Sequence, residues 1–368
     1  MNFFKITLLL ALALPFQLCQ SDRTSNSTPY PADPHSFAQP NDAVAKHLDL
    51  HLRLDFDQKI ASGYASWTIE NRNKGSKIIF DTDRLKIEKI TLGKDEKETT
   101  WRQIEPDSLL GSALEVDIEP TTDLLTIYYS TPPDAAAFSW LSPAQTAGKK
   151  MPFLFTQGQA ILARSWIPCQ DSPGIRITYD ATIEAPPGML VLMSADNPQQ
   201  KSPEGKYSFK MDKPISPYLI ALAAGDIDFQ AIGKRTGVYA EPSQVKKVAW
   251  EFADMERLVE AAEALYGEYA WDRYDLIVLP PSFPFGGMEN PKLTFATPTV
   301  VTGKRDLVAL VAHELAHSWS GNLVTNATWN DFWLNEGFTV YFERRIMEKL
   351  YGKDYVTMLA QLEYFELL

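Results

Sequence analysis

The stretch VAHELAH at residues 311–317 places two histidines four positions apart, with a glutamate directly after the first. Positions i and i+4 share one face of an α-helix, so the imidazoles of His313 and His317 can reach the same metal ion. A second stretch, WLNEG at residues 333–337, supplies Glu336, and eighteen residues separate it from His317. Three protein ligands leave one coordination position open, which is typical of a catalytic zinc. The spacing therefore predicts one zinc ion per chain, held as in a zinc peptidase.

Two more glutamates occur on the expected helices. Glu314 follows the first histidine directly and projects to the same side, where it can accept a proton from an attacking water molecule. Glu343 lies seven residues after Glu336, so it returns to the same helical face and can hydrogen-bond a ligand histidine. The sequence equally allows Glu343 to face solvent and to pair with Arg344 or Lys349. Glu314 is the predicted general base, and the partner of Glu343 stays open.

The stretch GGMEN at residues 286–290 precedes the expected metal-binding helix. Paired glycines remove side chains where a substrate backbone could lie along an exposed strand edge, and Glu289 could then hold a cation. If that cation is the free α-amino group of a peptide, the enzyme is an exopeptidase. An ordinary Gly-Gly turn explains the same residues equally well.

Composition describes an acidic globular chain. Its 368 residues, 45% of them hydrophobic, are enough for two or more domains with their own cores. The 35 Lys and Arg residues against 47 Asp and Glu residues give a formal net charge of −12. This balance argues against nucleic acid as a partner and offers no basic face for a membrane.

The first residues predict an exported protein. Residues 6–16 are apolar, follow a short basic start and are too few to span a bilayer, as in a secretory signal. Cys19 follows directly, where a bacterial lipoprotein would carry its lipid anchor. We expect residues 1–19 to be a signal or lipoprotein signal segment and residues 20–41 to be a flexible linker rich in Ser, Thr, Asn and Pro. The expected location is periplasmic, extracellular or lipid-anchored to the membrane.

Two structured domains are expected after this segment. Residues 47–57 alternate apolar and polar side chains with period two, which indicates a half-buried strand, and similar runs recur up to residue 192. Residues 42–229 therefore predict an all-β sandwich-like domain, and residues 230–368 predict a mixed α/β domain. The expected strands are residues 47–57, 63–69, 77–80, 124–129, 175–179, 189–192, 274–279 and 293–301. Pro298 suggests that the last of these is an edge strand. The expected helices are residues 243–267, 305–320 and 330–350. Helix-like sequence up to Leu368 predicts that the protein continues.

These motifs together resemble peptidase family M1, a family of zinc aminopeptidases. The likeness rests on GGMEN, on HELAHSW at residues 313–319 and on WLNEG. PPSFP at residues 280–284 and WIPCQD at residues 166–171 resemble the leukotriene A4 hydrolase and aminopeptidase B branch. The resemblance covers about residues 45–368. It implies a saddle-like β domain followed by a thermolysin-like zinc peptidase domain, which is incomplete in this chain.

The resemblance also assigns roles to individual residues. It implies that His313, His317 and Glu336 bind zinc, that Glu314 accepts the proton and that Glu289 holds the substrate N-terminus. QGQ at residues 157–159 is similar to a β-domain segment that reaches into the same cleft. The substrate-binding residues implied in this way are Gln157, Gly158, Gln159, Pro284, Phe285, Gly286, Gly287, Met288 and Glu289.

The chain departs from the family pattern in two places. Phe285 stands where members of the branch commonly carry a tyrosine, so aromatic packing is kept and a hydroxyl contact is lost. The family's transition-state tyrosine and its helical C-terminal domain would lie beyond Leu368. Four nearby tyrosines fall too early to match that tyrosine; they are Tyr341, Tyr351, Tyr355 and Tyr364. Loss of a donor to the developing oxyanion costs roughly 100- to 1,000-fold in rate, so a weak catalyst is expected.

The expected function is that of a zinc-dependent aminopeptidase acting on peptides with a free N-terminus. Two alternatives stay open. The metal motif alone also fits a zinc endopeptidase, and the cleft without useful catalysis would be a peptide-binding fragment. An N-acetylated peptide separates an aminopeptidase from an endopeptidase, because only the endopeptidase should cleave it.

Overall fold

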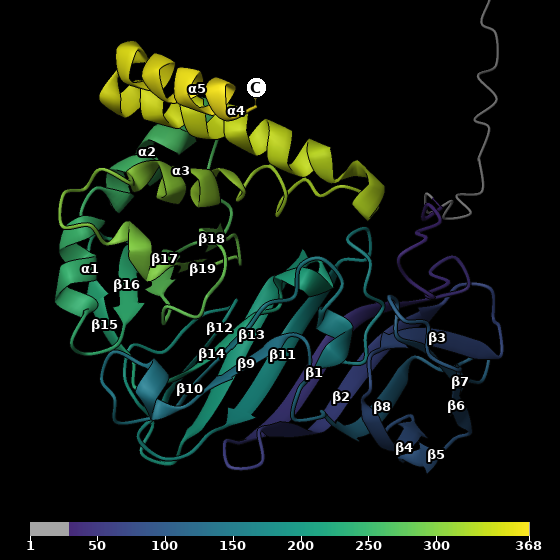
Figure 1. Cartoon of the computed structure of the whole chain (residues 1–368). Coiled ribbons are helices and arrows are strands. Elements are labelled where there is room, and N and C mark those ends of the chain that lie inside the picture. The colour runs from purple at the N-terminus through teal and green to yellow at the C-terminus, as the bar shows by residue number, and fades with distance from the viewer. Residues whose placement is uncertain (1–28, 368) are drawn as a thin grey trace, which may run out of the picture.

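The computed structural model describes residues 29–367. The predicted signal segment at residues 1–19 and the predicted lipid anchor at Cys19 lie outside this range. Within residues 29–367, none of the helices combines the length and the hydropathy needed to span a bilayer. The described residues fold into a β domain, here residues 43–225, and a mixed domain, here residues 228–367 (Figure 1). One hydrophobic core cluster extends through both domains.

A seven-stranded sheet in the order β13-β11-β1-β2-β8-β4-β5 is the frame of the β domain. Leu48, Leu50, Leu52 and Leu54 point into the core from one of its inner strands, as the period-two pattern predicts. The pair β1 and β11 is parallel and the other pairs are antiparallel. The strands are β1 (Ala43–Asp55), β2 (Ile60–Asn71), β4 (Lys86–Leu92), β5 (Lys97–Glu98), β8 (Leu124–Ser130), β11 (Ile177–Glu184) and β13 (Lys206–Ile215).

Two smaller sheets complete the β domain. One has the order β3-β7-β6 and the other the order β12-β14-β10-β9. Their strands are β3 (Lys77–Thr82), β7 (Ser112–Asp117), β6 (Trp101–Gln103), β12 (Leu190–Met193), β14 (Leu222–Gly225), β10 (Phe153–Thr156) and β9 (Phe138–Leu141). The predicted all-β architecture is confirmed for this part of the chain, because the α-helices of the described residues all begin after residue 244.

The WIPCQD motif at residues 166–171 is buried inside the β domain. The indole Nε1 of Trp67 donates to the carbonyl of Pro168 at 3.1 Å, and the Tyr129 hydroxyl donates to the carbonyl of Trp166 at 2.8 Å. The Gln170 side chain bonds to the backbone of β1. These contacts give the motif a role in holding the β domain together.

The second half of the predicted linker contacts the β domain and is not a free tether. The hydroxyl of Ser36 donates to Asp81 at 2.5 Å, and the backbone N–H of Phe37 donates to the same carboxylate at 2.7 Å. The hydroxyl of Ser172 donates to Asp33 at 2.5 Å. Composition predicted a flexible linker here because Ser and Pro are common in linkers, but the same polar side chains can satisfy a buried partner.

A five-stranded sheet in the order β15-β16-β17-β19-β18 begins the mixed domain. Its strands are β15 (Asp228–Ala231), β16 (Thr236–Ala240), β17 (Tyr274–Val278), β19 (Leu293–Ala296) and β18 (Gly287–Met288). The domain boundary predicted between residues 229 and 230 falls within β15. Pro298 lies beyond β19 and begins a 3₁₀ turn, so the edge next to β19 is β18, and the strand before Pro298 is an inner strand.

The described part of the mixed domain has five α-helices: α1 and α3 contact the sheet, and Figure 1 shows α4 and α5 side by side across α2 and α3. Their bounds are α1 (Val245–Glu251), α2 (Met255–Tyr266), α3 (Val308–Ala316), α4 (Phe332–Tyr351) and α5 (Lys353–Leu367). The single helix predicted over residues 243–267 is broken at residues 252–254, where the chain turns. The apolar spacing continues through this turn, so periodicity alone does not reveal the break.

The helix predicted over residues 305–320 is shorter than expected. It begins at Val308 because the preceding loop is held by the buried carboxylate of Glu251, which accepts hydrogen bonds from the backbone N–H groups of Gly303 and Arg305, each at 2.7 Å. Gly303 and Arg305 both have positive φ, which a helix does not allow. A loop fixed by a distant residue cannot be recognised from local sequence.

Candidate metal centre and substrate cleft

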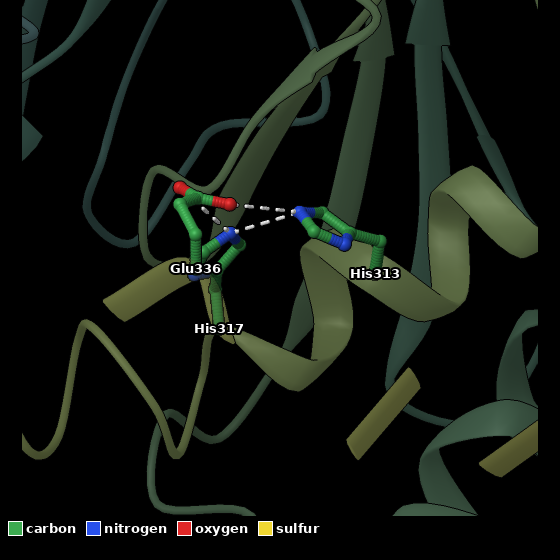
Figure 2. Close-up of side chains that lie close together, drawn as sticks. All are labelled: His313, His317 and Glu336. Carbon is green, nitrogen blue, oxygen red and sulfur yellow. Dashed lines mark hydrogen bonds and ion pairs between the residues drawn. The ribbon is translucent and has the colours of Figure 1, made fainter. Parts of the chain in front are cut away.

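The end of α3 presents the two histidines of the VAHELAH stretch. His313 lies in its last turn, and His317 is the residue directly after it, with φ −57° and ψ −22°. These angles are helical, so the side chains of His313 and His317 keep the i, i+4 relation and lie on one face. Their Nε2 atoms face each other at 3.2 Å (Figure 2). Two nitrogens bound to one tetrahedral zinc at about 2.0–2.1 Å lie at a similar separation, so the pair fits a single ion.

Glu336 approaches these nitrogens from α4. Its Oε2 lies 3.5 Å from Nε2 of His313, and its Oε1 lies 3.8 Å from Nε2 of His317. Figure 2 shows the carboxylate directed at both imidazoles. One ligand atom from each of the three side chains lies within 4.8 Å of the others, which makes the three residues a candidate metal-binding group. The structure thus brings together the three ligands predicted from spacing.

Each histidine is oriented through its other ring nitrogen. Nδ1 of His313 lies 3.1 Å from Oε2 of Glu343, and Nδ1 of His317 lies 3.0 Å from the carbonyl oxygen of Ser320. The hydroxyl of Thr339 lies 3.1 Å from Nδ1 of His317 and also donates to Ser320. Metal-binding histidines are commonly fixed in this way, because the partner sets both tautomer and ring orientation. Of the two partners left open for Glu343, the structure favours the histidine.

Glu314 is buried beside the histidines and faces the edge strand. A Cβ atom added to Gly287 would lie 2.2 Å from its Oε1, so the glycine leaves the space that this carboxylate occupies. Burial raises the pKa of Glu314 well above the usual carboxyl range; His313 opposes the shift, while Glu289, Glu336 and Glu343 add to it. A cation bound nearby would lower this pKa again. The location and the raised pKa of Glu314 are therefore suited to a group that exchanges a proton.

The cleft carries an excess of negative charge. Its volume is about 460 Å³, and four glutamates and two histidines are among the described residues that line it, together with no lysine or arginine. Burial alone would lower the pKa of His313, but hydrogen bonds with Glu336 and Glu343 and the charge of Glu314 raise it to about 10. A divalent cation would replace that proton and balance the carboxylates. The donor set of imidazole and carboxylate fits zinc.

The segment at residues 286–290 forms the edge of the five-stranded sheet along this cleft. Gly287 and Met288 constitute β18, which pairs only with β19 among the described strands. Glu289 follows, is buried, and its Oε1 has no hydrogen-bond partner among the described residues. Its backbone carbonyl accepts a hydrogen bond from the side-chain amide of Asn322 at 2.7 Å. An unpaired buried carboxylate oxygen beside an exposed strand edge is suited to a cationic ligand.

The β domain closes the other side of the cleft with residues 157–159. The amide of Gln157 contacts the sulfur of Met288 at 3.2 Å, and Gln159 lines the cleft. A Cβ atom added to Gly158 would lie 2.4 Å from the carbonyl oxygen of Tyr218, so this glycine allows two backbone segments to touch. Two neighbouring predicted residues differ in position: Phe285 lines the cleft, whereas Pro284 is exposed and is not among its lining residues.

Several residues of this site were not predicted from the sequence, among them Thr339, Asn322 and Tyr218. Thr339 lies three positions after Glu336 on the same face of α4, so helical spacing could have identified it. Asn322 reaches the site from a turn and Tyr218 from a short 3₁₀ helix (Pro217–Leu219), and no local pattern marks them. The Asn335 amide donates to the Tyr218 hydroxyl at 3.4 Å. Burial raises the pKa of that hydroxyl well above its usual value, and the charge of Glu289 adds to the shift.

The fold and this site define a class of metallopeptidase in which one helix supplies two histidines and the next supplies a glutamate. Comparisons with known proteins specify the family. The Peptidase M1 N-terminal domain matches residues 44–219, and the Peptidase family M1 domain matches residues 250–366. The chain belongs to peptidase family M1, which confirms the resemblance inferred from its motifs.

Individual relatives agree with this assignment. Leukotriene A-4 hydrolase from Xenopus laevis is 42% identical over 335 residues, which are 88% of this chain and 55% of the relative. Leucine aminopeptidase 2 from Yarrowia lipolytica is 44% identical over 308 residues, which are 82% of this chain and 47% of the relative. The chain therefore spans about half the length of the curated relatives that it matches.

The same similarity holds for solved structures. The structure of yeast LTA4 hydrolase in complex with Bestatin matches with a TM-score of 0.86 and 37% sequence identity. The match covers 95% of this chain and 55% of that one. It confirms the predicted fold class of a β-rich N-terminal domain followed by a mixed catalytic domain.

The comparisons overturn the prediction of an exported protein. Leukotriene A4 hydrolase and leucine aminopeptidase 2 are mainly cytosolic enzymes, which conflicts with an exported location. The prediction depended on a short basic start, an apolar run in residues 6–16 and Cys19 shortly after it, and so short a pattern does not identify a signal.

Proposed function

We propose that this protein is a zinc-dependent aminopeptidase that removes residues from the free N-terminus of peptides. Membership of peptidase family M1 supports a metallopeptidase, and the relatives named leucine aminopeptidase 2 support cleavage at the N-terminus. The observation that carries the proposal is the unpaired, buried carboxylate oxygen of Glu289 beside the metal-binding group. A substrate's free ammonium group would satisfy it.

The metal-binding residues in this proposal are His313, His317 and Glu336. When bound, zinc acts as a Lewis acid toward the scissile carbonyl and lowers the pKa of a water molecule toward 7. The orienting contacts of the two histidines and the negative charge of the cleft support a divalent cation at this place.

The remaining roles belong to residues of the cleft. Glu314 accepts the proton of the attacking water and transfers it to the leaving amine. Glu289 binds the α-amino group and so fixes which peptide bond lies beside the metal-binding group. The strand edge at Gly286 and Gly287 supports an extended peptide backbone, because no side chain projects from these two residues.

The test compares a peptide that begins with leucine with its N-acetylated form. The aminopeptidase proposal predicts cleavage of the free peptide alone, with zinc restoring activity after chelation. Glu314→Gln should keep zinc and lower kcat by about 100- to 10,000-fold, the range for loss of a general base. Glu260→Gln, an exposed glutamate on α2, is the matched control and should leave kcat unchanged.

Two outcomes would replace this proposal with the alternatives derived from the sequence. Cleavage of both peptides would indicate a zinc endopeptidase. Binding of the free peptide or of bestatin with no turnover would indicate a peptide-binding protein with weak catalysis. Bestatin is a suitable probe because it is the ligand of the similar yeast LTA4 hydrolase structure.

A further inference from the structure

The guanidinium group of Arg176, beside β11 of the β domain, bonds to two segments that lie far from it in sequence. Nε and Nη2 donate to the carbonyl of Pro214 at 3.2 and 2.6 Å. Nη2 also donates to the carbonyl of Asn322 at 2.7 Å. Nη1 donates to the carbonyl of Leu323 at 3.0 Å and to the hydroxyl of Thr325 at 2.7 Å. One side chain of the β domain thus binds the loop at residues 321–325 of the mixed domain.

The partners of Arg176 are unusual because each of them is a neutral oxygen. A half-buried charge is normally compensated by a carboxylate, and none is bonded to Arg176 among the described residues. Burial accordingly lowers the pKa of Arg176, while the group stays protonated at neutral pH. The planar fork of a guanidinium can hold several oxygens in fixed directions, which a point charge cannot do.

The two domains are in contact at this place. A Cβ atom added to Gly174 would lie 2.7 Å from the carbonyl oxygen of Ala327, so the backbones approach closely two residues before Arg176. The hydroxyl of Thr325 also donates to the carbonyl of Gly321 at 2.6 Å. Arg176 and Thr325 therefore fix both ends of the loop.

This loop connects directly to the metal centre and to the proposed amine site. It follows Ser320, whose carbonyl orients the imidazole of His317, and the backbone N–H of Asn322 donates to the carbonyl of His317 at 3.0 Å. The side-chain amide of Asn322 holds the backbone of Glu289 at 2.7 Å. A shift of the loop would move a metal-binding histidine and the amine-binding carboxylate together.

We infer that Arg176 is a positioning residue, through which the β domain sets the geometry of His317 and Glu289 by fixing the loop at residues 321–325. The inference rests on the proposed function for the roles of His317 and Glu289. The hydrogen-bond chain itself runs from Arg176 to Asn322 and from there to both residues. A purely structural role would affect stability and leave zinc affinity of the folded protein unchanged.

The test measures hydrogen exchange and zinc affinity in Arg176→Met, Arg176→Lys and Thr325→Val, with Arg53→Met on the exposed face of β1 as the control. In the metal-free protein, Arg176→Met should speed hydrogen exchange of the backbone amides of residues 321, 322 and 324 by about tenfold or more. The hydrogen bonds that these amides donate lie in or next to the loop that Arg176 no longer holds in this variant. Zinc affinity, measured by competition with a chelator, should fall by about tenfold.

The other variants distinguish geometry from charge and from folding. Arg176→Lys keeps the charge but not the fork, so its zinc affinity should lie closer to that of Arg176→Met than to that of the parent. Thr325→Val keeps the arginine and the side-chain shape, and should weaken zinc binding by a smaller factor in the same direction. Arg53→Met should match the parent in both measurements.

Two results would overturn the inference in distinguishable ways. If the folded Arg176→Met and Thr325→Val variants bind zinc as tightly as the parent, Arg176 does not position the site, and the proposed function stands. If the folded parent binds no zinc, the proposed function fails and takes the inference with it.

Discussion

Two buried clusters of charged side chains among the described residues, one in the β domain and one in the cleft, differ in how their charges are balanced. In the β domain, Arg164 bonds to Asp171 at 3.1 Å, and Asp81 accepts hydrogen bonds from Ser36 and from the backbone N–H groups of Phe37 and Asp171. In the cleft, four glutamates surround two histidines, with no lysine or arginine among the described lining residues. The first cluster supplies most of its own partners, and the second has no described lysine or arginine to balance its carboxylates.

This difference indicates that the β-domain cluster contributes to stability, whereas the cleft cluster is suited to a function. Burial raises the pKa of Asp171 to about 6, and the charge of Arg164 opposes that shift. The free-energy cost of burying the charges of the β-domain cluster is therefore offset by contacts within the fold. The cleft leaves an oxygen of Glu289 unpaired and raises the pKa of Glu314 well above its usual range. Strongly perturbed carboxyl groups that lack a compensating cation are typical of catalytic and metal sites.

The largest expected effect comes from breaking the balanced cluster. Arg164→Met removes the only described cation bonded to Asp171 and leaves two buried carboxylates, so the free energy of unfolding should fall by about 3–5 kcal/mol. Urea denaturation measures this change. Arg53→Met, which alters an exposed arginine, should change it by less than about 0.5 kcal/mol. An unchanged stability in Arg164→Met would mean that the cluster does not hold the β domain together.

A smaller effect is expected when an orienting contact of the unbalanced cluster is removed. Glu343→Gln keeps the shape of the side chain but removes the charge that faces Nδ1 of His313, so zinc affinity should fall by about 10- to 100-fold. Competition with a chelator measures the affinity. Glu260→Gln should bind zinc like the parent. Equal affinities for both variants would contradict an orienting role for Glu343.

The third prediction concerns pH. The pKa of His313 is raised to about 10 in the metal-free cleft, so the imidazole carries a proton throughout the neutral range and must release it to bind a metal. Zinc affinity should therefore rise about tenfold or more per pH unit between pH 6 and 8. Calorimetry in two buffers of different ionisation enthalpy would detect the released proton. A pH-independent affinity with no proton release would show that His313 is already neutral.

The sequence predicted the parts of the fold and site that depend on local spacing. Alternation in β1 identifies its buried leucines, and the i, i+4 relation identifies His313 and His317 as neighbours. Glu336 could be predicted as the third metal ligand because the helix that carries it was recognisable from the sequence. Each of these predictions needs only the periodicity of one element.

The parts that were missed depend on contacts between distant segments. The loop before α3 is fixed by Glu251, and the segment at residues 29–41 is fixed by Asp81. The same limit applies to Asn322, which contacts Glu289 across 33 positions of the sequence, and to Tyr218, which belongs to the β domain and enters the site only when the two domains are packed together. No single stretch of sequence contains both partners of any of these contacts.

The most direct test of the account is the zinc content of the purified protein, prepared without added metal, beside a His313→Ala/His317→Ala double variant. The account predicts close to one zinc per chain in the parent and none in the folded double variant. A folded parent without zinc, or equal zinc in both proteins, would contradict the claim that the unbalanced cluster is a metal centre.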